Sequence, residues 1–269
     1  MTTIQARATH QPAARFRVSF VRQLRSEWIK LASLRSTWWS IAIVAVLTVG
    51  IALLMALAIG DSGMPGVQMI VSPIQFTMLL AGILGAISVT GEYSTGMIRS
   101  TLSATPTRGL VLAAKAAVLA LFLFATSLVI FGIAAAVVSP ILESKSAAID
   151  WSDVSGSIQP ILVASLAMAV FALIGVAFGF LLRSGAGAIA ATVGLLFVLP
   201  IVLSMFGMAG PSWDWIRALG DYLPASAAQN AIVPQSDWGL EEPIAFLTLG
   251  GWVAAGMLAA WAVLRGRDA

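Results

Sequence analysis

Six long uncharged runs dominate the pattern of hydrophobic and polar positions along the chain. They lie between successive charged residues and cover 36–60, 62–91, 116–142, 154–182, 184–213 and 243–264. Each run exceeds the roughly 20 residues that a helix needs to cross a bilayer. A buried helix of a soluble protein needs only about 10 to 14 apolar residues, so six such runs argue against a soluble fold. The pattern predicts an all-α integral membrane protein with spans at about 38–59, 69–89, 110–138, 158–182, 186–206 and 243–264.

The composition points the same way. Hydrophobic residues make up 59% of the 269 residues and charged residues only 10%, with a mean hydropathy of +0.95. So little polar surface cannot coat a soluble domain. We expect residues 1–15, which are small, polar and without a repeating pattern, to form a disordered arm, and residues 16–269 to form a single transmembrane domain.

The charges predict an orientation. An even number of spans places both termini on one side, and that side holds all of the 15 Lys and Arg residues except Lys145 and Arg217. The acidic residues lie opposite, except Glu27, Glu92 and Asp268. Because basic residues mark the cytoplasmic side, we expect a multi-pass protein of the inner (plasma) membrane with both termini in the cytoplasm. The basic pI of about 9.8 then needs no nucleic-acid partner, since headgroup contacts account for it.

The sequence lacks the residues that several kinds of catalytic and binding site require. The chain has no cysteine, and its one histidine, His10, lies in the arm, which argues against thiol chemistry, histidine-based catalysis and a histidine-ligated metal. No lysine follows a glycine as a phosphate-binding loop requires. No charge falls in the middle of a span, which argues against a proton- or sodium-coupled carrier. We therefore expect a protein that is not an enzyme, holds no cofactor or metal and depends on an external energy source.

An amphipathic segment precedes the first span. On a helical wheel of residues 16–34, one stripe is apolar, the opposite face is polar, and Arg25 and Glu27 lie at the borders. The stripe contains Phe20, Val21, Leu24, Trp28 and Leu31, and the polar face contains Arg22, Gln23, Ser26 and Lys30. This predicts an elbow helix in the headgroup plane, and the alternative is a simple basic flank of the first span.

The polar stretch at 91–108 separates the second and third runs. Ser94 or Thr95 can cap a helix, Ile98 and Leu102 share a face at i, i+4, and Pro106 ends the helix. The pattern predicts a helix of one to two turns on the membrane surface. Lys115, in the first turns of the next span, can reach back to the headgroups or contact a partner.

Two later features are less specific. Gly175 and Gly179 have the GxxxG spacing that allows close helix packing, either inside the subunit or at a seam with a second copy. The external segment at 207–242 predicts one or two short helices held at the outer interface by Trp213, Trp215, Tyr222 and Trp238. A role in gating and a simple interfacial belt are both open for this segment.

Three segments resemble the ABC-2 type permeases, the membrane subunits of ATP-driven exporters. They are GEYSTGMIRSTLSATPTR at 91–108, followed by Lys115, SEWIKLASLRSTWW at 26–39 and GVAFGFLLRSGAGAI at 175–189. The resemblance implies that the 91–108 helix is a coupling helix that fits a cleft of the ATPase, with Ile98 and Leu102 as apolar contacts, Glu92 and Arg99 as polar contacts and Gly96 for close backbone approach. The ATPase-coupling residues would be Glu92, Tyr93, Gly96, Ile98, Arg99, Leu102, Pro106 and Arg108, and the elbow helix would border the ATPase-facing surface through Leu24, Glu27, Trp28, Lys30 and Leu31.

The resemblance also implies an assembly of two permease chains, identical or paralogous, with two ATPase subunits that bind ATP and Mg. Spans one and five would lie near the second permease, and the 207–242 segment would cap the exit. The cargo could be a small hydrophobic compound, a lipid or a peptide. The alternatives are a membrane scaffold or immunity protein that moves nothing, and a secondary carrier.

Overall fold

A computed structural model describes residues 19–59, 63–105, 107–145, 147–207, 213–233 and 239–266. Throughout these ranges the regular structure is helical. Six segments of the described chain are long and apolar enough to cross a membrane: Arg35–Ala58, Gly66–Ser94, Arg108–Glu143, Val154–Leu182, Gly185–Phe206 and Glu242–Gly266. This confirms the predicted all-α architecture and its six candidate spans, and the chain is a multi-pass membrane protein. The expected arm at 1–15 lies outside the described residues.

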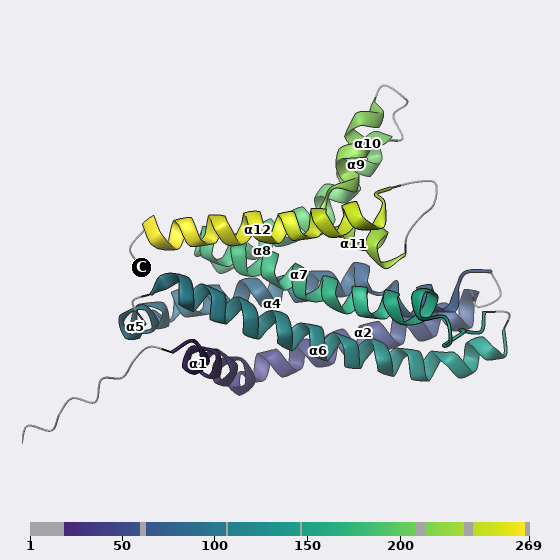
Figure 1. Ribbon diagram of the computed structural model, residues 1–269, viewed down its shortest axis with the longest axis horizontal. Coiled ribbons are helices and arrows are strands. Elements are labelled where there is room, and N and C mark those ends of the chain that lie inside the picture. The colour runs from purple at the N-terminus through teal and green to yellow at the C-terminus, as the bar shows by residue number, and fades with distance from the viewer. Residues whose placement is uncertain are drawn as a thin grey trace, which may run out of the picture.

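The long helices run side by side (Figure 1). In chain order the helices are α1 (Phe20–Ser33), α2 (Arg35–Ile59), α3 (Gly66–Val71), α4 (Ile74–Ser94), α5 (Met97–Ala104), α6 (Arg108–Glu143), α7 (Gln159–Leu182), α8 (Gly185–Val193), α9 (Leu199–Gly207), α10 (Asp214–Asp221), α11 (Pro224–Ile232) and α12 (Glu242–Gly266). Helices α1 and α5 and the C-terminal end of α12 lie at the left of Figure 1. Arg108 at the start of α6 donates to the Leu264 carbonyl of α12 at 2.6 Å. We call this part of the bundle the α5 end.

Three spans are interrupted, each beside a proline. The second span breaks between α3 and α4 at Pro73. One π-helical turn (Val154–Ile158) precedes α7 and another (Gly194–Val198) precedes α9, and each is followed within two residues by Pro160 or Pro200. Proline has no N–H to offer the carbonyl four residues earlier, and a wider turn accommodates the lost hydrogen bond.

Small residues bring α4 and α7 into backbone contact. A Cβ added at Gly175 would overlap the carbonyl oxygen of Gly82, and one added at Gly179 would lie 2.8 Å from the Cβ of Val89. Gly85 faces the backbone of Ala172 in the same way. Such close approach lets dispersion forces and backbone contacts hold helices together where no water can be released from apolar surface. Gly175 and Gly179 therefore pack within the subunit.

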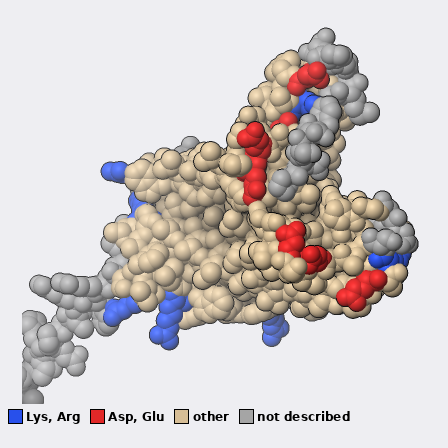
Figure 2. All heavy atoms as spheres, turned by 45° about the vertical axis from the view of Figure 1, so that its right-hand side comes forward, with Lys and Arg blue, Asp and Glu red and all other residues tan. Residues whose placement is uncertain are grey.

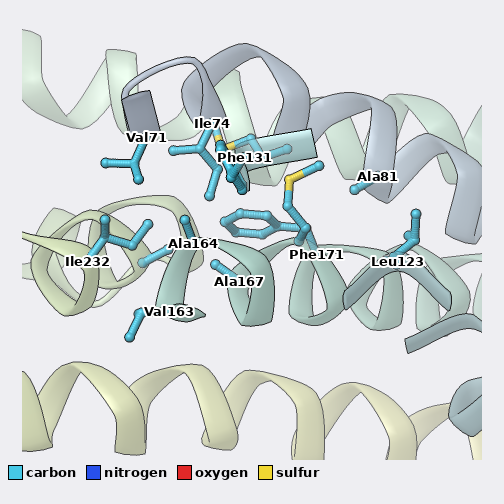
Figure 3. Packing of buried hydrophobic residues seen from close by; sticks show 14 of the residues in the cluster. Val71, Ile74, Ala81, Leu123, Phe131, Val163, Ala164, Ala167, Phe171 and Ile232 are labelled. Atoms are coloured by element: carbon cyan, nitrogen blue, oxygen red, sulfur yellow. The ribbon is translucent and has the colours of Figure 1, made fainter. Parts of the chain in front are cut away.

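The core extends outward from this pair. Figure 3 shows buried side chains of α3, α4, α6, α7 and α11 meeting in one cluster, among them Phe131 of α6, Phe171 of α7 and Ile232 of α11. Helix α7 is buried along most of its length, whereas α2, α8, α9 and α12 leave much of their apolar surface uncovered.

The described part of the 207–242 segment contains two short helices, α10 and α11, as the sequence predicts. Helix α11 is buried against α7 and α12, with Ala227, Ala228 and Ala231 almost fully covered. Helices α9 and α10 project from the side of the bundle (Figure 1). Trp213, Trp215 and Tyr222 are exposed, as an anchoring role requires, while Trp238 lies outside the described residues.

Charges are segregated along the bundle. On the face shown in Figure 2, most Lys and Arg side chains gather toward the α5 end, and the Asp and Glu side chains lie toward the other end. The orientation predicted from the sequence rests on this asymmetry.

Candidate functional site

Four charged side chains from three helices meet inside the α5 end. They are Glu27 and Lys30 of α1, Glu92 of α4 and Lys115 of α6. The side chains of Glu27, Glu92 and Lys115 are 3%, 8% and 6% exposed, and that of Lys30 is 24% exposed. We call these four residues the ionic cluster.

Each lysine of the ionic cluster joins both carboxylates. Lys30 Nζ lies 2.8 Å from Glu27 Oε1 and 2.9 Å from Glu92 Oε1. Lys115 Nζ lies 2.7 Å from Glu27 Oε2 and 2.8 Å from Glu92 Oε1, and it also donates to the Ser88 carbonyl at 3.3 Å. Two positive and two negative groups balance, so the ionic cluster carries no net charge.

The local sequence explains how the three helices deliver these groups. Glu27 and Lys30 are three residues apart and therefore share one side of α1. Helix α4 continues to Ser94, past the predicted end of the second span near 89. Glu92 therefore lies beyond the glycine contact between α4 and α7. Lys115 lies two turns into α6, facing inward. Removing one member of such a buried pair leaves an uncompensated charge, which costs about 3–5 kcal/mol.

The electrostatic surroundings keep Lys30 charged. Burial alone would lower the pKa of Lys30, but the hydrogen bonds and charges of Glu27 and Glu92 outweigh it, so the pKa is raised above its ordinary value. Lys30 therefore stays an ammonium group throughout the physiological range.

Further side-chain hydrogen bonds extend the ionic cluster toward α5. Lys30 Nζ donates to Thr101 Oγ1 at 3.4 Å, and Thr105 Oγ1 donates to Gln23 Oε1 at 3.1 Å. Gln23 Nε2 in turn donates to Glu27 Oε1 at 3.5 Å. Helix α5 is thus linked to α1 at Thr101 and at Thr105, the residue directly after the helix.

The start of α5 differs from the prediction. Ser94 and Thr95 do not cap it, because their hydroxyls donate to the Gly91 carbonyl at the end of α4, at 3.0 and 2.8 Å. The turn is made at Gly96, whose φ of 71° favours glycine, and α5 begins at Met97. Gly96 is exposed and forms the turn between α4 and α5, and the expected close approach of a partner to it stays a prediction.

The predicted coupling residues on α5 separate into an inner and an outer set. Ile98 is 2% exposed and Leu102 is half-buried against the core, whereas Arg99 is exposed. The expected partner contacts of Ile98 and Glu92 are therefore revised, because both side chains are buried within the subunit. Met97, which is 45% exposed, is the large apolar residue that α5 presents outward.

The remaining loop residues contact the ends of other spans. The Tyr93 ring lies 5.3 Å from the guanidinium carbon of Arg183 and packs edge-on against Phe180 of α7. Arg108 binds the end of α12, as described above. Pro106 lies outside the described residues.

The predicted elbow residues of α1 also differ in burial. Helix α1 buries Glu27 and Leu31, together with Gln23, against the bundle, whereas Leu24 is half-buried. Trp28 is 47% exposed and packs edge-on against Phe122 of α6. The side of α1 that meets protein is therefore largely polar, and Phe20 and Val21 point away from the protein.

A cavity of about 350 Å³ adjoins the ionic cluster. Its lining comes from α1, α2, α4, α5 and α6, and all four residues of the ionic cluster contribute to it. Gly91 and Ser88 of α4 and Leu119 of α6 form part of the remaining wall. Among the described residues, no three His, Cys, Asp or Glu side chains gather as metal ligands.

The sequence singled out Glu27, Lys30, Glu92 and Lys115 separately, but it did not predict that these four side chains form one cluster. One signal was available: a lysine within an apolar run needs a counter-charge, and Glu27 and Glu92 are the only acidic residues on the basic side before the C-terminal tail. A search of protein-family models found no match to this chain, and a search of curated proteins found none either.

Proposed function

We propose that the chain is the membrane-spanning permease subunit of an ATP-driven exporter of the ABC-2 type. Two permease chains, identical or paralogous, would form the pathway, and two separate ATPase subunits would bind and hydrolyse ATP with Mg. The chain itself would have no enzymatic activity and no cofactor. It would lie in the plasma membrane with α1, α5 and both termini on the cytoplasmic side.

The observation that carries this proposal is the attachment of α5. Its outer side is exposed at Met97, Arg99 and Ser100, and its inner side is fixed to the bundle by Ile98. Glu92, just before the turn at Gly96, is paired with α1 and α6. A partner that pushes on α5 would therefore move the ends of α1, α4 and α6 together, which is the task of a coupling helix.

Other features support the proposed assembly. Few residues of α2, α8 and α9 are buried within one subunit, as expected if a second permease contacted spans one and five. The exposed polar residues of α5 suit a protein partner in water better than a lipid surface.

The competing functions predict different behaviour. A secondary carrier needs an ionisable group that is free to exchange a proton or an ion, and the ionic cluster is instead charge-balanced. A scaffold or immunity protein would bind partners without any associated ATP hydrolysis.

Copurification tests the proposal. The chain is tagged in its native host and purified from membranes in a mild detergent, and vanadate-sensitive ATP hydrolysis is measured in the purified complex. Arg99→Glu reverses a charge on the exposed side of α5 without touching the ionic cluster. Arg25→Glu, on the exposed side of α1, is the matched control.

We expect wild type and Arg25→Glu to retain ATPase activity, and Arg99→Glu to insert normally but lose at least about tenfold of the bound activity, as truncation of an interface hot spot does. A purified wild-type complex without ATP hydrolysis would refute the exporter proposal. Equal activity in all three proteins would refute the assignment of α5 as the contact.

A further inference from the structure

The two carboxylates of the ionic cluster are used unequally. Glu27 accepts from lysines with both oxygens, Lys30 at Oε1 and Lys115 at Oε2. Glu92 accepts from both lysines with Oε1 alone. Its Oε2 is buried and has no hydrogen-bond partner among the described residues. Glu92 as a whole is only 6% exposed. A buried carboxylate oxygen without a hydrogen-bond donor destabilises the structure, so a donor bound to Glu92 Oε2 would be stabilising.

The open space beside Glu92 is large enough for a ligand. The 350 Å³ cavity that Glu92 lines lies within the lower range of small-molecule sites, about 300–1,000 Å³. A Cβ built on Gly91, another lining residue, meets no atom within 4 Å. Glu92 lies at the wall of this space, but its Oε2 has almost no accessible surface, so a donor group in the cavity reaches Oε2 only when the carboxylate turns toward it.

The rest of the lining is amphipathic. Leu34 and Ile87 are 52% and 49% exposed, and Ile87 lies on a membrane span. Ser36 adds an exposed hydroxyl group to the same lining, whereas the hydroxyls of Ser33 and Thr95 donate to backbone carbonyls. The cavity thus combines a buried acceptor, an apolar wall that a lipid chain can reach and a hydroxyl donor.

Charge balance further restricts the chemical class of the ligand. The ionic cluster is already neutral, so a lone cation placed against Glu92 would leave a net charge in a buried site. A zwitterionic headgroup adds no net charge. Its ammonium can donate to Glu92 Oε2, and its phosphate can accept from the Ser36 hydroxyl of the lining.

We propose that this cavity is a binding site for the primary-ammonium headgroup of a membrane phospholipid, of the phosphatidylethanolamine type. The ammonium group lies against Glu92 Oε2, and an acyl chain leaves along Leu34 and Ile87. The site requires only that the chain spans a membrane, so it stands or falls separately from the exporter proposal.

Phosphatidylcholine is the matched ligand control. It has the same phosphate, glycerol and acyl chains, but its quaternary ammonium has no N–H to donate. Native mass spectrometry of the detergent-solubilised chain, with equal amounts of the two lipids carrying identical acyl chains, measures the ratio of the first bound lipid. One hydrogen bond to a charged group predicts a preference for phosphatidylethanolamine of at least about tenfold.

Gly91→Leu tests the location without touching the ionic cluster. The new side chain enters the cavity from a helical position where its Cβ clashes with nothing, so the melting temperature should stay at the wild-type value while the preference falls to about one, the result for a lost hydrogen bond. Gly250→Leu on α12, where an added Cβ also meets nothing within 4 Å, should keep the preference. Glu92→Gln should lose it too, and Gly91→Leu remains informative if that variant folds poorly.

Three outcomes would overturn the proposal. They are equal binding of the two lipids by the wild-type chain, an unchanged preference in Gly91→Leu, and binding of dodecylamine without binding of phosphatidylethanolamine. The last outcome would assign the cavity to a free amphiphilic amine rather than to a lipid of the bilayer.

Discussion

The middle and the end of α4 are both buried, yet different interactions hold them. In the middle, Gly82 and Gly85 contact the backbone of α7 with no intervening side chain. At the end, Glu92 is held by two lysines from other helices beside a cavity of about 350 Å³. The glycine contact allows one arrangement only, whereas the ionic cluster joins long side chains that can follow a moving helix. We infer that the α4–α7 contact is the fixed part of the bundle and the α5 end is the adjustable part.

The largest effect is expected from breaking the glycine contact. Gly175→Leu places a side chain against the backbone of Gly82, which cannot rotate away. Overpacking costs about 1–3 kcal/mol where side chains can adjust, so this substitution should exceed that range and abolish the folded protein. The readouts are the monodisperse yield and melting temperature in detergent. Gly132→Leu on α6, where an added Cβ meets nothing within 4 Å, should behave as wild type. A stable Gly175→Leu protein would contradict the fixed contact.

A smaller effect is expected from unbalancing the ionic cluster. Lys115→Met leaves Glu27 and Glu92 to share Lys30, and the loss should be about 3–5 kcal/mol in unfolding free energy. Adding Glu27→Gln restores neutrality and should recover part of this loss. Denaturant titration of the two variants measures both steps. A double variant less stable than Lys115→Met would show that the carboxylate of Glu27 stabilises the site for some reason other than its pairing with Lys115.

The link between α5 and α1 should contribute least of the three. Thr105→Val removes the donor to Gln23 Oε1, and the expected loss is about 1 kcal/mol, the net value of a neutral hydrogen bond. The same titration measures it. A loss as large as that of Lys115→Met would mean that α5 is held mainly by this bond and not by the ionic cluster.

Single cysteines should leave stability within about 0.5 kcal/mol of wild type and report which side each end of the bundle faces. Ser103 and Ser184 are exposed near the α5 end, and Ser144 and Ser152 are exposed beyond the other end of α6. We expect membrane-impermeant maleimide added to whole cells to label only the second pair. Labelling of Ser103→Cys in intact cells would reverse the proposed orientation.

The spans could be predicted from the sequence because length and hydropathy alone define them. Their packing could not. The fifth span has a mean hydropathy of 2.5 and the fourth 2.7, yet the rest of the chain covers far less of the fifth. What distinguishes them is the series of glycine and alanine contacts along α7, which becomes visible only when α4 lies opposite.

The ionic cluster was not predicted from the sequence for a related reason. Lys115 pairs with Glu27, 88 positions away, and Lys30 with Glu92, 62 positions away, so no local pattern connects them. The helical wheel of α1 ranked its faces by their affinity for water. In a membrane protein the apolar side can face lipid and the polar side can face protein, and α1 buries Gln23 and Glu27 accordingly. The helix at α5 was expected, but its start depended on whether Ser94 and Thr95 cap α5 or bond back to α4.

Site-specific photocrosslinking from α5 tests the central claim most directly. A benzophenone side chain at Ser100, on the exposed side of α5, is activated in native membranes, and the products are probed with radiolabelled 8-azido-ATP. The same residue at Ser144, beyond the other end of α6, is the control. The account predicts an ATP-binding crosslinked product from Ser100 and none from Ser144. An ATP-binding product from Ser144 alone, or none from either site, would contradict the assignment of α5 as the place where an ATPase acts on the bundle.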